Sequence, residues 1–131
     1  MPHDMGGVYG FFTHNTPARV GVLLLLRDLE RELGKDTDNG KAVPVPARVF
    51  TERLRLAYGL PRRRLQGVSA MFRVWTKRIY FEKAGHDEQG LPLYALGNFG
   101  KLTLLTTEPS VEAEAMKLMR RCQSTGTLSL H

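Results

Sequence analysis

A single row of apolar residues constrains the fold of this chain more than any other feature. Its members alternate three and four residues apart and are Leu65, Val68, Phe72, Trp75 and Ile79. This spacing places them all on one face of an α-helix, which we predict to begin at Pro61 because proline is favoured in the first helical turn. Gly67 costs about 1 kcal/mol inside a helix relative to alanine, so we expect another backbone to approach it closely.

The apolar pattern changes to that of β-strands after Arg78. Residues 79–82 and 93–96 each have the composition of a strand, and the polar loop between them contains turn glycines. We therefore predict a β-hairpin. Residues 101–106 are a candidate third strand.

A long helix is predicted ahead of this region. It starts at Thr16 as N-cap, with Pro17 in the first turn, and ends near Gly34. The residues expected on its inward face are Val22, Leu25, Leu26, Leu29 and Leu33. Leu23 and Leu24 widen the apolar face, so we expect burial on more than one side.

Two shorter helices complete the predicted elements. One covers residues 46–58, ends at Gly59, and turns inward the residues Val49, Phe50, Leu54 and Ala57 or Tyr58. The other starts at Glu108 and turns inward the residues Val111, Ala115, Leu118 or Met119, and Cys122. The basic residues near its C-terminal end are Lys117, Arg120 and Arg121, and positive charge is favourable at the negative end of the helix dipole.

These elements predict an α+β fold in one domain over residues 1–131. It has three N-terminal helices, a hairpin with the candidate third strand, and a C-terminal helix. Residues 1–15 have the pattern of either a strand or a loop. Residues 35–45 are predicted to be an exposed linker, and residues 123–131 a frayed tail.

Positive charge is concentrated in one segment. Residues 48–83 hold ten basic and two acidic side chains, a formal charge of +8, whereas the whole chain carries +6. Clustered Lys and Arg attract phosphate without regard to base sequence, which underlies most nucleic-acid binding. An ordinary solvated basic face is the alternative.

The helix pair within this segment resembles a helix-turn-helix. The residues that carry the resemblance run from Leu54 to Leu65, with Ala57 as the small residue of the first helix and Gly59 in the turn. The hairpin that follows resembles the wing of a winged helix-turn-helix protein, so the likeness covers residues 47–97. It is a superfamily-level pattern and implies a second helix that enters the major groove of DNA.

The resemblance implies which residues would contact DNA. Near the start of the second helix, Arg62 or Arg63 and Gln66 would reach base edges, because Arg pairs with guanine and Gln with adenine. Later basic residues would contact phosphate. The candidate nucleic-acid-binding residues are Arg53, Arg62, Arg63, Arg64, Gln66, Ser69, Arg73, Lys77, Arg78 and Lys83.

Two features of the sequence do not fit a DNA-binding winged helix. The hairpin tip, His86-Asp87-Glu88, is acidic, whereas a wing along a phosphate backbone usually carries Lys or Arg. The aromatic residues Trp75, Tyr80, Phe81, Tyr94 and Phe99 would suit stacking of single-stranded RNA bases. Trp75 belongs to the helical row, which favours a core position for it.

No catalytic pattern is present in the sequence. The four histidines lack metal-site spacing, and the glycines near Tyr9 match no phosphate-binding loop. We therefore expect neither an enzyme nor a bound metal or cofactor. The single cysteine, Cys122, is expected in a helix core, and the absence of a signal or membrane-spanning segment favours a cytoplasmic protein.

The sequence thus favours a small DNA-binding regulator or a plasmid or phage accessory factor, with double-stranded DNA as partner. RNA or an acidic protein bound by the same basic face is the alternative. The leucine-rich first helix and the last helix are candidates for a homodimer contact, which would match a two-fold DNA site.

Overall fold

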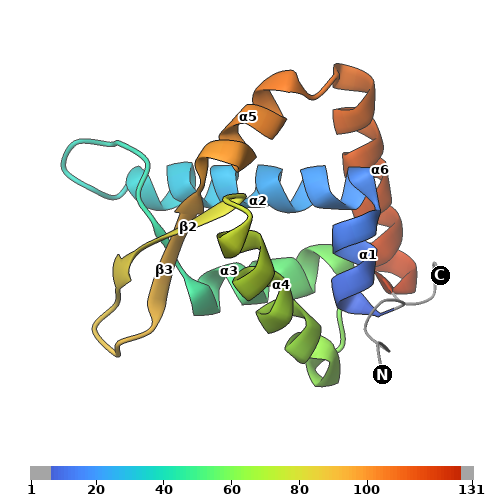
Figure 1. Ribbon diagram of the computed structural model, residues 1–131, viewed down its shortest axis with the longest axis horizontal. Coiled ribbons are helices and arrows are strands. Elements are labelled where there is room, and N and C mark those ends of the chain that lie inside the picture. Colours follow the sequence, from blue (N-terminus) through green and yellow to red (C-terminus); the bar gives the residue numbers. More distant parts are fainter. Residues whose placement is uncertain (1–6, 128–131) are drawn as a thin grey trace.

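The computed structural model describes residues 7–127 and has an α+β fold (Figure 1). The elements in chain order are α1 (Val8–His14), α2 (Thr16–Gly34), β1 (Val45–Pro46), α3 (Ala47–Tyr58), a 3₁₀ turn (Arg62–Arg64), α4 (Leu65–Lys77), β2 (Phe81–His86), β3 (Pro92–Leu96), α5 (Asn98–Thr106) and α6 (Pro109–Thr125). In the view of Figure 1, α2 crosses the molecule, with α3 and α4 below it and α5 above it.

The sheet has the order β1-β3-β2 and is antiparallel. The hairpin prediction is confirmed, although β2 begins at Phe81 rather than Ile79. The third strand was predicted in the wrong place. It is β1, at the end of the predicted linker, where Val45 is buried and pairs with Tyr94. Residues 35–42 of that linker are exposed as predicted.

Residues 101–106 belong to helix α5 instead of a strand. Gly100 and Leu104, one turn apart, face the rest of the protein. Threonine usually favours strands because it is β-branched. Here the hydroxyls donate within the helix: Thr103 to the carbonyl of Phe99 at 2.7 Å and Thr106 to that of Leu102 at 3.0 Å. Short apolar runs leave helix and strand ambiguous, and here helix packing decides.

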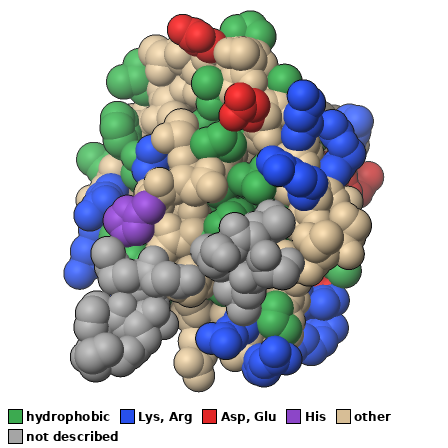
Figure 2. Space-filling model, turned by 90° about the vertical axis from the view of Figure 1, so that its right-hand side faces the viewer, with side chains coloured by type: hydrophobic (Ala, Val, Ile, Leu, Met, Phe, Trp, Pro, Cys, Tyr) green, Lys and Arg blue, Asp and Glu red, His purple; other side chains and the backbone are tan. Residues whose placement is uncertain are grey.

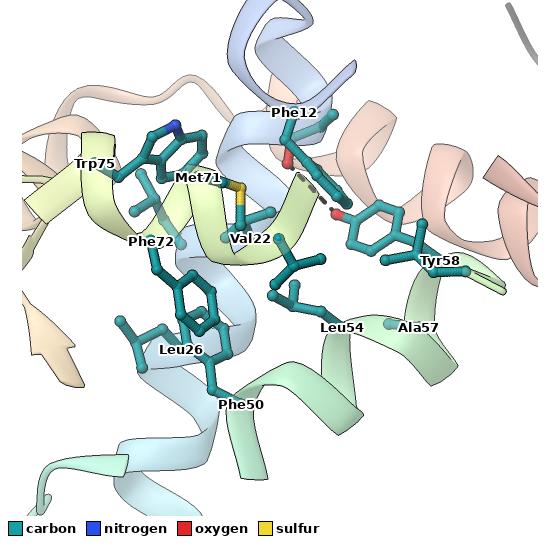
Figure 3. Packing of buried hydrophobic residues seen from close by; sticks show 14 of the residues in the cluster. Phe12, Val22, Leu26, Phe50, Leu54, Ala57, Tyr58, Met71, Phe72 and Trp75 are labelled. Atoms are coloured by element: carbon teal, nitrogen blue, oxygen red, sulfur yellow. Dashed lines mark hydrogen bonds between the residues drawn. The ribbon is translucent and has the colours of Figure 1, made fainter. Parts of the chain in front are cut away.

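The row of apolar residues on α4 is buried as predicted, apart from its two ends. Phe72 and Trp75 are buried, together with Met71 (Figure 3). Val68 is buried as well, and Leu65 is half-buried. Ile79 was wrongly placed on this face: it lies beyond the helix, with 53% of its surface exposed and a φ of +64°. The helix also begins later than predicted, because residues 62–64 form a 3₁₀ turn.

Helix α1 replaces the strand or loop predicted for residues 8–14. It packs on α4 where Gly67 leaves room, since a Cβ on Gly67 would lie 2.9 Å from Cβ of Val8. The predicted close approach at Gly67 is therefore confirmed. The indole Nε1 of Trp75 donates to Oγ1 of Thr13 at 3.3 Å, which anchors the other end of α1.

The long helix and the last helix form as predicted, with small differences at their ends. The N-cap of α2 is Asn15, whose Oδ1 accepts from the amide of Ala18 at 3.1 Å, and not Thr16. Residues 123–125 of the predicted frayed tail are helical, and Thr127 is buried. Residues 128–131 lie outside the described range.

Gly59 ends α3 and brings the following turn against α6. Its φ is +62°, the left-handed region that glycine adopts freely. A Cβ here would also overlap the carbonyl oxygen of Cys122 in α6. Thr127 donates its hydroxyl to the carbonyl of Tyr58 beside this turn. The turn between α3 and α4 is thus fixed from outside by the end of α6.

Gly59→Ala should destabilise the protein by about 2–4 kcal/mol, because it combines a strained φ with a backbone overlap. Gly90→Ala is the matched control: its φ is +81°, but a Cβ would meet nothing within 4 Å. The control should lose only about 1 kcal/mol. Urea unfolding measures both, and equal losses would contradict the proposed contact with α6.

Glu30 links α2 to the central strand. Its carboxylate accepts from the amide of Leu96 at 2.6 Å, beyond the end of the short strand β1. Partial burial raises the pKa of Glu30 above its ordinary value of 4.5, and the Leu96 hydrogen bond and the nearby Lys101 offset part of this. The ionised form is therefore less favourable in the fold than in the unfolded chain.

Glu30→Gln keeps an acceptor oxygen and removes the charge. Because the folded wild type holds a proton to higher pH than the unfolded chain, its stability falls as pH rises through the window above 4.5. We expect the stability of the variant relative to wild type to increase between about pH 4 and pH 7. Urea unfolding across this range would contradict the assignment if the difference stayed constant or reversed.

Candidate nucleic-acid interface

The outer face of α4 carries a polar stripe opposite its buried face. Its members, at helical spacing, are Gln66, Ser69, Arg73 and Lys77, and all are exposed. The stripe follows from the burial of Val68, Phe72 and Trp75, because a helix that turns these residues inward must turn positions 66, 69, 73 and 77 outward. The sequence prediction of this face is confirmed geometrically.

Three exposed arginines precede the stripe. Arg62, Arg63 and Arg64 form the 3₁₀ turn that leads into α4. Within residues 7–127, Arg63 and Arg64 have no carboxylate in ion-pair range, whereas Arg62 lies 3.7 Å from Glu52. No side chain caps the start of α4. The beginning of this helix is therefore a cationic surface with only one weak neutralising contact.

Arg53, another of the predicted binding residues, is paired with a carboxylate within the protein. Its guanidinium donates to both carboxylate oxygens of Glu32, at 3.2 and 3.3 Å, and so ties α3 to α2. The hydrogen bond from Arg53 lowers the pKa of Glu32. Arg55 is paired in the same way, with Glu52 at 2.7 Å. The charges of these two arginines are therefore balanced by carboxylates of the same protein.

The hairpin contributes one exposed basic residue, and its acidic tip has a structural role. Lys83 is exposed on β2, an edge strand, and Arg78 is exposed just before it. At the tip, Oδ1 of Asp87 accepts from the amides of Gln89 and Leu91, both at 2.9 Å. This carboxylate builds the turn, as Asp side chains commonly do.

Most of the aromatic side chains are part of the core. Trp75, Phe81 and Tyr94 are at most 5% exposed. Tyr80 is half-buried and packs against Phe99 with ring centroids 4.8 Å apart. Of the five aromatic residues predicted to suit stacking, only this pair is accessible.

Further basic residues lie outside the predicted set. Arg48 is exposed in the first turn of α3, and Lys117, Arg120 and Arg121 line a shallow depression on α6 with Ser124. Figure 2 shows the end of the molecule that carries α1 and α6, with Lys and Arg gathered in separate groups. Lys117, Arg120 and Arg121 are three and four residues apart, so the sequence could have predicted that they share one face of α6.

Comparisons of the chain with protein-family models, with curated proteins and with solved structures find no match. In the part of the chain that the structure covers, no helix has the length and apolarity to cross a bilayer. The same residues contain no group of three or more His, Cys, Asp or Glu side chains placed to hold a metal ion.

The exposed cations of the α4 surface should be dispensable for folding. The triple variant Arg63→Gln/Arg73→Gln/Lys77→Gln removes side chains that have no ion-pair partner among residues 7–127. We expect its free energy of unfolding to stay within about 0.5 kcal/mol of wild type, or to rise as repulsion falls. Chemical denaturation tests this, and a loss well above 1 kcal/mol would show that the stripe has a structural role.

Proposed function

We propose that the protein is a small winged helix-turn-helix DNA-binding protein, a transcriptional regulator or a plasmid or phage accessory factor that acts in the cytoplasm on double-stranded DNA. The observation that carries this proposal is the exposed polar stripe of α4, preceded by Arg62–Arg64 and held by a rigid core on the opposite face. A helix of this kind fits the major groove and presents side chains to base edges.

The order of the elements supports the winged-helix assignment. Helix α2, strand β1, the α3–α4 pair and the β2–β3 hairpin follow one another, and β3 lies between β1 and β2. The hairpin therefore begins at the end of α4, where it can approach the DNA backbone beside the groove. Lys83 and Arg78 lie at this junction and are exposed.

The residues of the stripe divide into two roles. Gln66 and Ser69, with Arg63 before them, would make hydrogen bonds to bases. Arg73, Lys77 and Arg78 would contact phosphate and position the helix without reading sequence. Arg64 lies at the start of α4, where no side chain caps the helix. The free backbone amides of the first turn of α4 would favour a phosphate as well.

The composition of the stripe favours DNA over the two alternatives. An acidic protein partner would be expected to meet apolar or aromatic anchors at the centre of its contact, and the stripe has none between Gln66 and Lys77. An RNA-binding role through stacking is disfavoured, because Trp75, Phe81 and Tyr94 are buried.

The test is selection from random-sequence duplex DNA with the purified protein. We expect enrichment of a defined motif, and we expect Gln66→Ala to relax the preference at one base pair at a cost of about 1–3 kcal/mol. Arg73→Ala should weaken all sequences uniformly and lower the salt dependence by about one phosphate contact.

Arg53→Ala is the matched control, since it also removes one positive charge but from a side chain paired with Glu32. It should leave both motif and salt dependence unchanged. If no motif is enriched, or if Arg53→Ala and Arg73→Ala weaken binding equally, α4 is not a DNA-reading helix.

A further inference from the structure

A depression of about 420 Å³ lies where α2, α5 and the end of β3 meet. Its volume falls within the range of small-molecule sites, about 300–1,000 Å³. The lining combines an apolar wall with positive charge, a combination typical of sites for organic anions. Three leucines and three basic residues line this surface, here called the α2–α5 depression: Leu96, Leu104, Leu105, Arg27, Arg31 and Lys101.

The basic residues of the depression have weak partners or none among residues 7–127. Nε of Arg27 lies 3.7 Å from Oδ1 of Asp28, which is too far for a hydrogen bond. Arg31 and Lys101 are exposed, and no carboxylate of the described residues lies in ion-pair range of either. Arg27 and Arg31 are four residues apart on α2, so they are neighbours on one helix face. The three positive charges are therefore available to a ligand.

The carboxylate of Glu30 lines the same depression but does not neutralise it. Its Oε2 accepts from the amide of Leu96 at 2.6 Å. Burial raises the pKa of Glu30 even though Lys101 and Arg31 lie near enough to lower it. These cations therefore do not fully compensate for the burial of this carboxylate. With three basic side chains and one acidic side chain, the lining has a formal charge of +2.

Neighbouring depressions lack this combination of groups. The depression on the Phe99 side of α5 contains one basic residue, Arg19, whose guanidinium already donates to the carbonyl of Thr13 at 2.6 Å. The basic depression on α6 is lined by polar side chains alone. An apolar wall beside unpaired cations is thus a property of the α2–α5 depression and not of basic surface in general.

We propose that the α2–α5 depression binds a small organic anion that consists of a carboxylate and an apolar body. The carboxylate would lie between Arg31 and Lys101, with Arg27 beside it, because guanidinium groups pair with carboxylates through two parallel hydrogen bonds. The apolar body would cover Leu104 and Leu105, since removal of apolar surface from water is favourable. The proposal does not depend on DNA binding.

The test is titration of the full chain with octanoate, followed in two-dimensional amide NMR spectra. We expect saturable shifts at Leu96, Lys101 and Leu105, with a dissociation constant of about 1 mM or below. The amide of Leu96 is a direct reporter because it donates to Glu30 inside the depression. Acetate has the charged group without the body, and octanol has the body without the charge. Each should bind about tenfold more weakly or not at all.

Two variants should change the affinity for octanoate in opposite directions. Arg31→Gln/Lys101→Gln should raise the dissociation constant about tenfold, because two exposed ion pairs with the ligand are lost. Glu30→Gln should lower it about two- to fivefold, because it removes a negative charge and keeps an acceptor for the amide of Leu96. The same spectra report whether each variant keeps its fold.

Lys117→Gln/Arg120→Gln is the matched control, because it removes two positive charges from exposed positions on α6. It should bind octanoate like wild type. The proposal is overturned by an absence of saturable shifts, by equal weakening in the two double variants, or by shifts confined to residues outside α2, β3 and α5. Binding of acetate or inorganic phosphate as tight as that of octanoate would also overturn it, because the apolar wall would then have no part in recognition.

Discussion

Four aromatic rings from four different elements hold the structure together. Phe72 of α4 stacks on Phe50 of α3 with centroids 5.0 Å apart and an interplanar angle of 16°. Phe81 of β2 contacts both rings edge-on, at 5.4 and 5.7 Å, and Tyr94 of β3 packs on Phe72 at 5.0 Å. Offset and edge-to-face pairs are the favoured geometries of aromatic rings. This cluster fixes how α4 lies relative to the hairpin, and so where the outer stripe of α4 points.

The helical part of this arrangement could be predicted because burial and spacing agree there. Phe72 and Trp75 belong to one row, and once the row faces inward, Gln66 and Arg73 have no other direction than outward. The same rule failed at Ile79. The turn after α4 needs a left-handed residue, and the spacing of apolar residues does not report backbone conformation.

Other elements could not be predicted because long-range contacts decide them. Strand β1 consists of Val45 and Pro46, and nothing in two residues predicts that they pair with β3. Helix α1 depends on the space that Gly67 leaves, which the sequence signalled without naming the partner. In the candidate site, the pairing of Arg53 with Glu32 joins residues 21 positions apart, so spacing alone could not separate Arg53 from the free arginines.

The fold divides its basic residues into two sets. Arg53 and Arg55 have close carboxylate partners, and the first of these pairs joins two helices. Arg63, Arg64, Arg73 and Lys77 are exposed at the start and along the outer face of α4, and no carboxylate among residues 7–127 lies within ion-pair range of them. Like charges held close together disfavour the compact state, so stability does not account for this cluster, whereas the proposed DNA partner would neutralise it.

Backbone hydrogen bonds also join the end of α4 to the start of α5. The carbonyls of Ile79 and Tyr80 accept hydrogen bonds from the amides of Phe99 and Gly97, at 3.0 and 2.9 Å. The start of α5 is therefore fixed to the end of α4 by backbone contacts, with no flexible linker between them. The C-terminal end of α4, and with it the polar stripe, is thus held by the start of α5 as well as by the aromatic cluster.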